Sequence, residues 1–152
     1  MTANERVIVV AAAESLDSTA VREKLHLEGC GSIVSFLGIT RGVDEGVEIK
    51  RLEFDAWEEK LPQVLSNLGH EALSKFGVSS VSMAHRTGSV GPSEPIVAIH
   101  VGSPHRKEAF HACHWLIDEL KKQAPLWKKE VRTDGAHWKE GRGFPASFVF
   151  LA

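Results

Sequence analysis

A short segment, Ser103-Pro104-His105-Arg106, combines residues typical of a helix start with two side chains that bind anions. Serine is a favoured helix N-cap, and proline is favoured at the first helical position because its missing N–H costs nothing there. The pattern predicts His105 and Arg106 in the first turn, where free N–H groups and the helix dipole attract anions. Cations are disfavoured at that end, so the pair indicates an anion site. A solvated helix end with an incidental arginine explains these four residues equally well.

A lysine lies on the margin of the apolar face of the same predicted helix. At about 100° per residue, one face gathers the apolar side chains, with Phe110 at its edge: Ala109, Cys113, Leu116, Ile117 and Leu120. Lys121 falls nearly in line with Ile117, whereas Lys122 points to the polar side. Such a lysine either extends into solvent, which is the commoner outcome, or lines a pocket where it can transfer protons.

A second lysine follows Pro125, which ends the predicted helix. On an extended strand, Lys128 and Glu130 share one face, while Trp127 and Lys129 share the other. One interpretation is a charged edge strand that resists aggregation. The other places Lys128 opposite Lys121 across a pocket. The spacing leaves both interpretations open.

Two arginines are weaker candidates. Arg41 follows a predicted strand and lies between Thr40 and Gly42, where a loop side chain can contact a ligand. Arg142 lies in a basic, glycine-containing segment, residues 138–143, which either reaches a neighbouring subunit or forms a plain surface loop.

Neither a metal nor a nucleotide site is expected. His111 and His114 lie three residues apart on the predicted helix, but no carboxylate or thiolate accompanies them at zinc-like spacing. Cys113 lies on the apolar face and is expected in the core. The glycines form no dinucleotide or P-loop motif. We therefore expect no metal and no cofactor.

The composition is that of a soluble globular domain. The chain has 152 residues, 43% of them hydrophobic, and a net charge of −2, so nothing global indicates nucleic acid or a membrane surface. Any anion site must be built locally from a few cations. The two cysteines form no CxxC pair, and no apolar run is long enough for a membrane span. These features predict a cytoplasmic protein.

The elements that must position these residues follow from periodicity and from helix breakers. We expect strands over residues 7–13, 32–39, 47–57, 78–86 and 96–101, an extended stretch after 125 and a final strand over 148–151. One break in the alternation of 47–57 indicates a β-bulge. Helices are expected from Ser18 or Thr19 to about 27, over 58–76, and from 103 to about 123, with a loop over 43–46. The fold class is therefore α+β, with antiparallel strands and interspersed helices in one domain, residues 1–152.

Taken in order, several of these segments resemble the molybdopterin synthase large-subunit family over roughly residues 31–142. The matching segments are Gly38-Ile39-Thr40-Arg41, the 52–57 strand, His85-Arg86-Thr87-Gly88, Ser103-Pro104-His105-Arg106 with Ala109-Phe110, Ile117-Asp118 through Lys121, Ala124-Pro125-Leu126-Trp127-Lys128-Lys129-Glu130, and Trp138. The ordered series is specific to that family, although each fragment alone is weak.

The resemblance implies an α/β-hammerhead fold and a sulfurtransferase. Sulfur from the C-terminal Gly-Gly thiocarboxylate of a small ubiquitin-like carrier subunit would pass twice to cyclic pyranopterin monophosphate, which forms the molybdopterin dithiolene. By position, Lys121 and Lys128 match the family's catalytic lysines. His105, Arg106 and Arg41 match its anion and substrate contacts.

The resemblance also implies a homodimer of large subunits, each binding one small subunit in a heterotetramer. Arg142 matches an arginine that reaches in from the other protomer. No metal or redox cofactor is needed for this chemistry.

Two other functions compete with this interpretation. A non-catalytic binding module would use the same cations to hold a partner's acidic C-terminal tail. A phosphate-ester hydrolase would use His105 as an acid or base, but it needs a nucleophile or a metal-ligand set that the sequence lacks.

Overall fold

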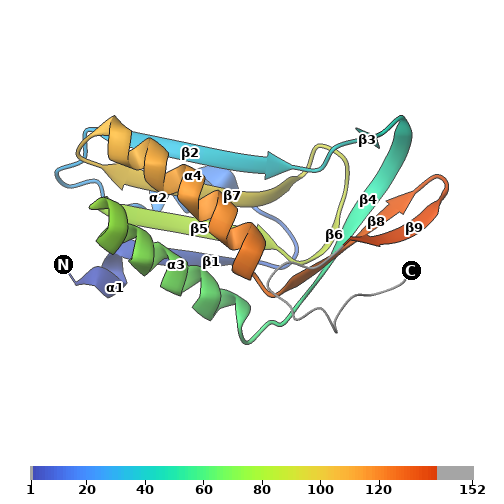
Figure 1. Ribbon diagram of the computed structural model, residues 1–152, viewed down its shortest axis with the longest axis horizontal. Helices are drawn as coiled ribbons and strands as arrows, with labels where there is room; N and C mark the ends of the chain where they lie inside the picture. The colour runs from blue at the N-terminus through green and yellow to red at the C-terminus, as the bar shows by residue number, and fades with distance from the viewer. Residues whose placement is uncertain (1, 140–152) are drawn as a thin grey trace.

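Two β-sheets organise residues 2–139, the part of the chain that the computed structural model describes (Figure 1). The larger, called the main sheet below, contains four strands. In spatial order they are β1 (Val7–Ala12), β5 (Ser80–Arg86), β7 (Pro95–Ser103) and β2 (Ser32–Ile39). β1 and β5 run parallel, whereas the β5–β7 and β7–β2 pairs are antiparallel. β2 is therefore an edge strand.

The second sheet is antiparallel and extends from one end of the main sheet (Figure 1). Its spatial order is β3 (Val43–Asp44), β4 (Val47–Ala56), β8 (Leu126–Arg132) and β9 (Gly135–Lys139). β6 (Gly88–Val90) also pairs with β4. β4 and β8 are long partners, so the residues that follow Pro125 are held inside this sheet and not at its edge.

Helices cover both faces of the main sheet. α3 (Leu61–Phe76) and α4 (Arg106–Gln123) pack side by side on one face, and α2 (Ser18–Glu23) lies on the other (Figure 1). A short helix, α1 (Ala3–Arg6), precedes β1. β5 shows why both faces need cover: all seven of its residues are buried, with Met83 in the core under α3 and α4 and Ala84 in the core under α2. Successive strand residues point to opposite faces.

The end of α4 is set by its sequence. Ala124 leaves the helix with an extended backbone, ψ 126°, because a residue before proline is disfavoured in the helical region. The chain enters β8 two residues later and runs into the second sheet. Ala124 and Pro125 therefore join the last turn of α4 directly to the first residues of β8.

Most predicted elements are present, and the α+β class is confirmed. The apolar face of α4 is buried as predicted, and Gly77 ends α3 with a left-handed backbone, φ 70°. The predicted bulge is also present, as a register shift of the β4–β8 pair between Ile49 and Arg51.

Several boundaries and one pairing were predicted wrongly. The β1–β5 pair is parallel, so the strands are not all antiparallel. The cap of α2 is Asp17, whose side chain accepts a hydrogen bond from the Ala20 N–H, and the helix ends at Glu23. Residues 43–46 are no plain loop but form β3 and a tight turn with positive φ at Glu45 and Gly46. The predicted strand over 148–151 lies outside the described residues, so a single domain over 1–152 stays a prediction.

Candidate functional site

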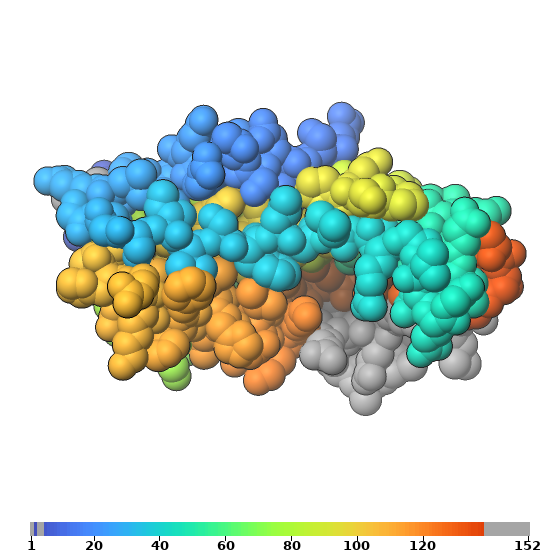
Figure 2. Space-filling view, turned by 90° about the horizontal axis from the view of Figure 1, so that it is seen from above, coloured from blue at the N-terminus to red at the C-terminus, as the bar shows by residue number. Residues whose placement is uncertain are grey.

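A pocket of about 760 Å³ lies where the C-terminal end of α4 meets both sheets. In Figure 2, the surface is hollowed between that end of α4, β2 and the β3–β4 hairpin. Apolar side chains of β2, β7 and α4 form most of its wall. The lining residues are Phe36, Leu37, Gly38, Ile39, Arg41, Phe54, His85, Ile96, Val97, Ile99, Ile117, Leu120, Lys121, Ala124, Leu126 and Lys128.

Three cations line this pocket, each from a different element. Arg41 follows β2, Lys121 lies in the last turn of α4, and Lys128 lies on β8. Among residues 2–139, no aspartate or glutamate lines the pocket. The wall is therefore positive as well as apolar, which suits an anionic ligand with a flat or apolar portion.

Lys121 combines the two predicted positions, because it is exposed and also lines the pocket. It lies one helical turn beyond Ile117, and both residues line the pocket. Lys121 remains exposed to solvent, so it reaches the pocket without being buried. The prediction that Lys121 falls in line with Ile117 is confirmed, because both side chains line the pocket.

Lys128 and its neighbour Lys129 face opposite ways, as the strand alternation predicted. Lys129 points away from the pocket, with Nζ 2.9 Å from a carboxylate oxygen of Glu53 and 5.3 Å from the centre of the Trp138 ring. Hydrogen bonds from Lys129 and Arg51 lower the pKa of Glu53. β8 lies between β4 and β9, so the edge-strand interpretation of this segment is wrong. Lys129 takes part in a surface network, whereas Lys128 is a pocket residue.

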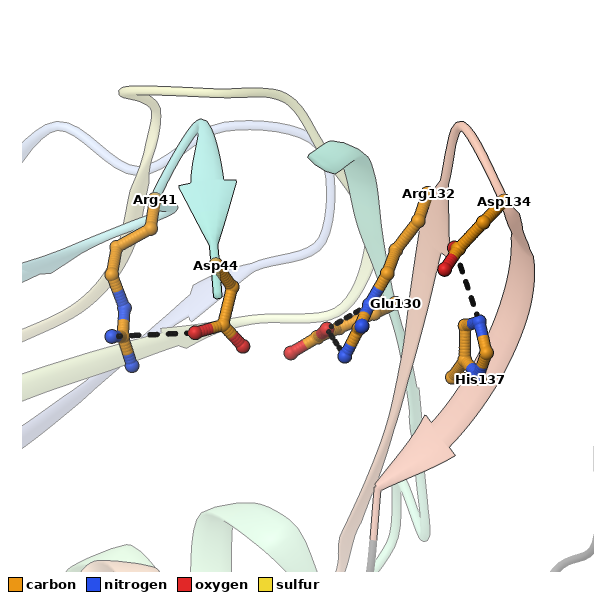
Figure 3. Close-up of polar contacts among 6 residues, drawn as sticks. All are labelled: Arg41, Asp44, Glu130, Arg132, Asp134 and His137. Carbon is orange, nitrogen blue, oxygen red and sulfur yellow. Dashed lines mark hydrogen bonds and ion pairs between the residues drawn. The ribbon is translucent and has the colours of Figure 1, made fainter. Parts of the chain in front are cut away.

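Ion pairs lie along the second sheet (Figure 3). Arg41 lies 3.9 Å from Asp44, and the Arg41 side chain is 78% exposed, so its guanidinium can turn toward a ligand. Glu130, on β8, is buried and accepts hydrogen bonds from Nε and Nη2 of Arg132 at 2.9 and 2.8 Å. Both nitrogens approach the same carboxylate oxygen, Oε2, so the charge of buried Glu130 is paired. Glu130 and Arg132 both lie on β8, the strand that also carries Lys128.

His85 also lines the pocket, although the sequence predicted no role for it. Its Nδ1 donates a hydrogen bond to the carbonyl oxygen of Arg86 at 2.8 Å, and its ring meets Phe54 edge-on at 5.2 Å. Burial, helped by the nearby charge of Lys128, lowers the pKa of His85 to about 4, although the hydrogen bond to Arg86 opposes this shift. The imidazole is therefore neutral near pH 7. In the sequence, His85 stands out only as part of the family-like segment His85-Arg86-Thr87-Gly88.

Comparison with known proteins adds the decisive observation. The family model described as "MoaE protein" matches residues 9–123, which is more than half of the chain. The chain belongs to the MoaE family.

Relatives in this family are named for one activity. The molybdopterin synthase catalytic subunit of Pyrococcus abyssi is 37% identical over 111 residues, or 73% of this chain and 75% of that protein. The crystal structure of molybdopterin synthase from Staphylococcus aureus matches with a TM-score of 0.77 and 34% identity, covering 86% of this chain and 95% of that chain. A complex of subunits 1 and 2 of the molybdopterin-converting factor from Helicobacter pylori matches with a TM-score of 0.72 and 25% identity, covering 91% and 94%.

In this MoaE-family chain, His105 and Arg106 lie at the other end of α4. Arg106 is the first helical residue, fifteen residues before Lys121, which corresponds to about 22 Å along the helix axis. Both side chains are exposed, and neither lines the pocket. The structure therefore brings Arg41, Lys121 and Lys128 together but leaves His105 and Arg106 apart from them. Arg142 lies outside the described residues.

The predicted cap of α4 was wrong for a reason outside the local sequence. Ser103 is the last residue of β7 and pairs with Ser32 of β2, so its backbone belongs to the main sheet. The N-cap is His105, which makes no side-chain capping hydrogen bond. Gly31 fits against this segment because a Cβ there would lie 2.6 Å from the Pro104 carbonyl oxygen. Arg106 is still in the first turn, as predicted.

Residues 2–139 contain neither a metal-binding cluster nor a membrane-spanning helix. No group of three or more His, Cys, Asp or Glu side chains lies close enough to hold a metal ion. No helix in this part of the chain has both the length and the apolar character needed to cross a membrane. Cys113 is a buried core residue, and burial raises the pKa of its thiol to about 11.

Proposed function

We propose that this chain is the catalytic subunit of a molybdopterin synthase. It would transfer sulfur from the C-terminal thiocarboxylate of a small carrier subunit to cyclic pyranopterin monophosphate and so form the molybdopterin dithiolene. The observation that carries the proposal is the convergence of Arg41, Lys121 and Lys128 in one pocket. Family membership and the named activity of the relatives support the same reaction.

The pocket suits the charges of this reaction. The substrate carries a cyclic phosphate and the carrier a thiocarboxylate, so two anions must approach each other. Converging cations offset their repulsion, and a partly apolar wall strengthens each electrostatic contact. Arg41 offers a forked donor for phosphate or carboxylate.

Lys121 and Lys128 are proposed to move protons. Sulfur addition to the pterin side chain, opening of the cyclic phosphate and release of the carrier's carboxylate each need a proton donor or acceptor. The two lysines approach the pocket from a helix end and a strand, so they can serve different atoms of one bound substrate. No metal or redox cofactor is required for these steps.

The partners proposed are the small carrier subunit and a second copy of this chain, in a heterotetramer. The Helicobacter pylori complex is described as one of two subunits, which supports the first partner. β2 is an open edge strand with exposed apolar side chains at Ile33, Leu37 and Ile39, and Phe110 of α4 is also exposed. An apolar edge of this kind supports a chain–chain contact.

A homodimer would also give His105 and Arg106 a role. They lie about 22 Å along α4 from Lys121, too far to touch a substrate held in the pocket of the same chain. We propose that they bind substrate in the pocket of the second copy. Arg142 is proposed to reach that pocket in the same way.

The compartment proposed is the cytoplasm. Cys30 and Cys113 are both free thiols, which fits a reducing compartment.

Reconstitution tests the proposed function. The chain is incubated with thiocarboxylated carrier and cyclic pyranopterin monophosphate, and molybdopterin is measured. We expect product from the wild type and none from Lys121→Ala, with carrier binding unchanged in both. No product from the wild type with a verified, bound carrier would favour a binding module, and a near-normal yield from Lys121→Ala would disprove the lysine's role.

A further inference from the structure

His85 is held in one orientation and one tautomer. A carbonyl oxygen only accepts hydrogen bonds, so the 2.8 Å contact with the Arg86 carbonyl places the proton on Nδ1. The edge-on contact with Phe54 fixes the plane of the ring, and the residue is 8% exposed. The other nitrogen, Nε2, therefore carries a lone pair and acts as an acceptor.

Within residues 2–139, the charged side chains that line the pocket with His85 are all cations. The charge of Lys128 acts on His85, and the Cα of Lys128 pairs with that of Phe54, the residue whose ring contacts His85. Lys121 from α4 and Arg41 from the end of β2 line the same pocket. Among the described lining residues, His85 is the side chain that offers a hydrogen-bond acceptor. The neutral acceptor, Nε2 of His85, therefore shares the pocket with three donor side chains.

We propose that His85 is a positioning residue of the pocket: its Nε2 accepts a hydrogen bond from the Lys128 ammonium group and holds that group toward the substrate. The kinetic consequence rests on the proposed sulfur transfer, whereas the contact itself does not. Lys128 has several rotatable bonds and loses considerable freedom when it is held in place. A fixed acceptor reduces that loss for each catalytic cycle.

The neutral state of His85 is essential to this role. A protonated imidazole would present a donor and a charge to Lys128 and would repel it. Burial keeps the pKa of His85 near 4, so the acceptor persists throughout the physiological range. The role therefore predicts no titration of His85 near pH 6.5, where an ordinary histidine changes charge.

Two matched substitutions separate this role from a structural one. The side-chain amide of asparagine reaches about as far as Nδ1, so His85→Asn keeps a donor for the Arg86 carbonyl and loses the acceptor. The amide of glutamine reaches about as far as Nε2, so His85→Gln keeps an acceptor and loses the donor. We expect His85→Asn to lower kcat roughly tenfold to hundredfold, the range for a lost hydrogen bond to a charged group, with KM little changed. His85→Gln should stay within about threefold of wild type.

Equal activity of the two variants would overturn the proposal. So would losses in both that follow their melting temperatures, because a structural role predicts that His85→Asn, which keeps the Arg86 contact, is the milder change.

A second measurement needs no activity. Nitrogen NMR of the wild type, carrying ¹⁵N-labelled histidine, should show the proton of His85 on Nδ1 and an unprotonated Nε2 from pH 8 to about pH 5. Lys128→Met should shift the Nε2 signal, and the matched change Lys129→Met should leave it in place. An Nε2–H tautomer, or no response to Lys128→Met, would overturn the proposal. If the wild type makes no molybdopterin, the proposed function fails while this measurement still decides the contact.

Discussion

The two ends of α4 carry similar cations in very different surroundings. At the C-terminal end, Lys121 lines a pocket that Lys128 of β8 also lines. At the N-terminal end, His105 and Arg106 are exposed, and neither lines the pocket that contains Lys121. The helix dipole favours cations at the first of these ends and disfavours them at the second. Within one chain, these cations line the pocket only at the helix end that meets other structural elements.

The largest expected effect is a difference in kcat/KM between variants of Lys128, which lines the pocket, and of its neighbour Lys129 on β8. Lys128→Ala should lower kcat/KM by about 10²–10⁴, the usual contribution of a positioned proton-transfer group. Lys129→Ala should stay within about threefold, because Lys129 contacts Glu53 and Trp138 on the other face. Steady-state kinetics of both variants with saturating carrier makes the comparison. Similar losses in the two would mean that the pocket does not define the site.

Mixed dimers test whether the N-terminal end of α4 serves the pocket of a second copy. Lys121→Ala and Arg106→Ala chains are each expected to be impaired alone. In a mixed dimer, the Arg106→Ala chain keeps its Lys121 and receives Arg106 from its partner, so one of the two pockets is complete. Activity should recover to about half of the wild-type value per mixed dimer. If both groups act within one chain, mixing will restore nothing.

His85, at the pocket end of α4, should make the free energy of unfolding depend on pH. Its pKa is lowered from 6.5 to about 4 in the folded chain, so the unfolded chain binds more protons between these values. The resulting stability is fully present above pH 6.5 and is lost as the pH falls toward 4, by up to about 3 kcal/mol. Urea unfolding at pH 7 and pH 4.5 should show this fall in the wild type and a smaller one in His85→Gln. Burial also lowers the pKa of His100, so His100 contributes to the fall in the same direction. If the free energy of unfolding of His85→Gln falls as much as that of the wild type, His85 is not the source of the pH dependence.

The smallest expected effect is on the free energy of unfolding, and it should have opposite signs for cations removed from the two ends of α4. Arg106→Gln removes a cation from the unfavourable end and should raise the free energy of unfolding by a few tenths of a kcal/mol. Lys122→Gln removes one from the favourable end, together with its 3.6 Å ion pair to Glu119, and should lower it by a similar amount. Both changes in the free energy of unfolding should become smaller at high salt, because salt screens the charges. Denaturation at low ionic strength measures them, and the same sign in both variants would rule out a dipole effect.

Local pattern was enough to predict the register of α4. Lys121 falls in line with Ile117 because helix geometry is set within a few residues, and both residues line the pocket. The alternation of β8 likewise predicted that Lys128 and Lys129 face opposite ways. What lies opposite Lys128 could not be predicted, because the β4–β8 pairing joins segments far apart in the sequence.

Non-local packing also explains the predictions that were wrong or missing. Ser103 looks like a helix cap, but β2 takes up its backbone in the main sheet. The parallel β1–β5 pair follows from a crossover that no local pattern reveals. His85 shares a motif with Arg86, yet its neutral state comes from burial beneath Phe54 and beside Lys128, which only the folded chain provides.

The most direct test of the account follows the sulfur itself in two matched double variants. Carrier bearing a ³⁵S-labelled thiocarboxylate is bound to each variant, cyclic pyranopterin monophosphate is added, and label in the pterin product is counted in a single turnover. Lys122→Ala/Lys129→Ala removes two lysines adjacent in sequence to the pocket pair and should transfer label as the wild type does. Lys121→Ala/Lys128→Ala should bind carrier equally well and transfer no label. Transfer at the wild-type rate by the second variant would contradict the claim that the pocket between α4 and β8 is where sulfur transfer takes place.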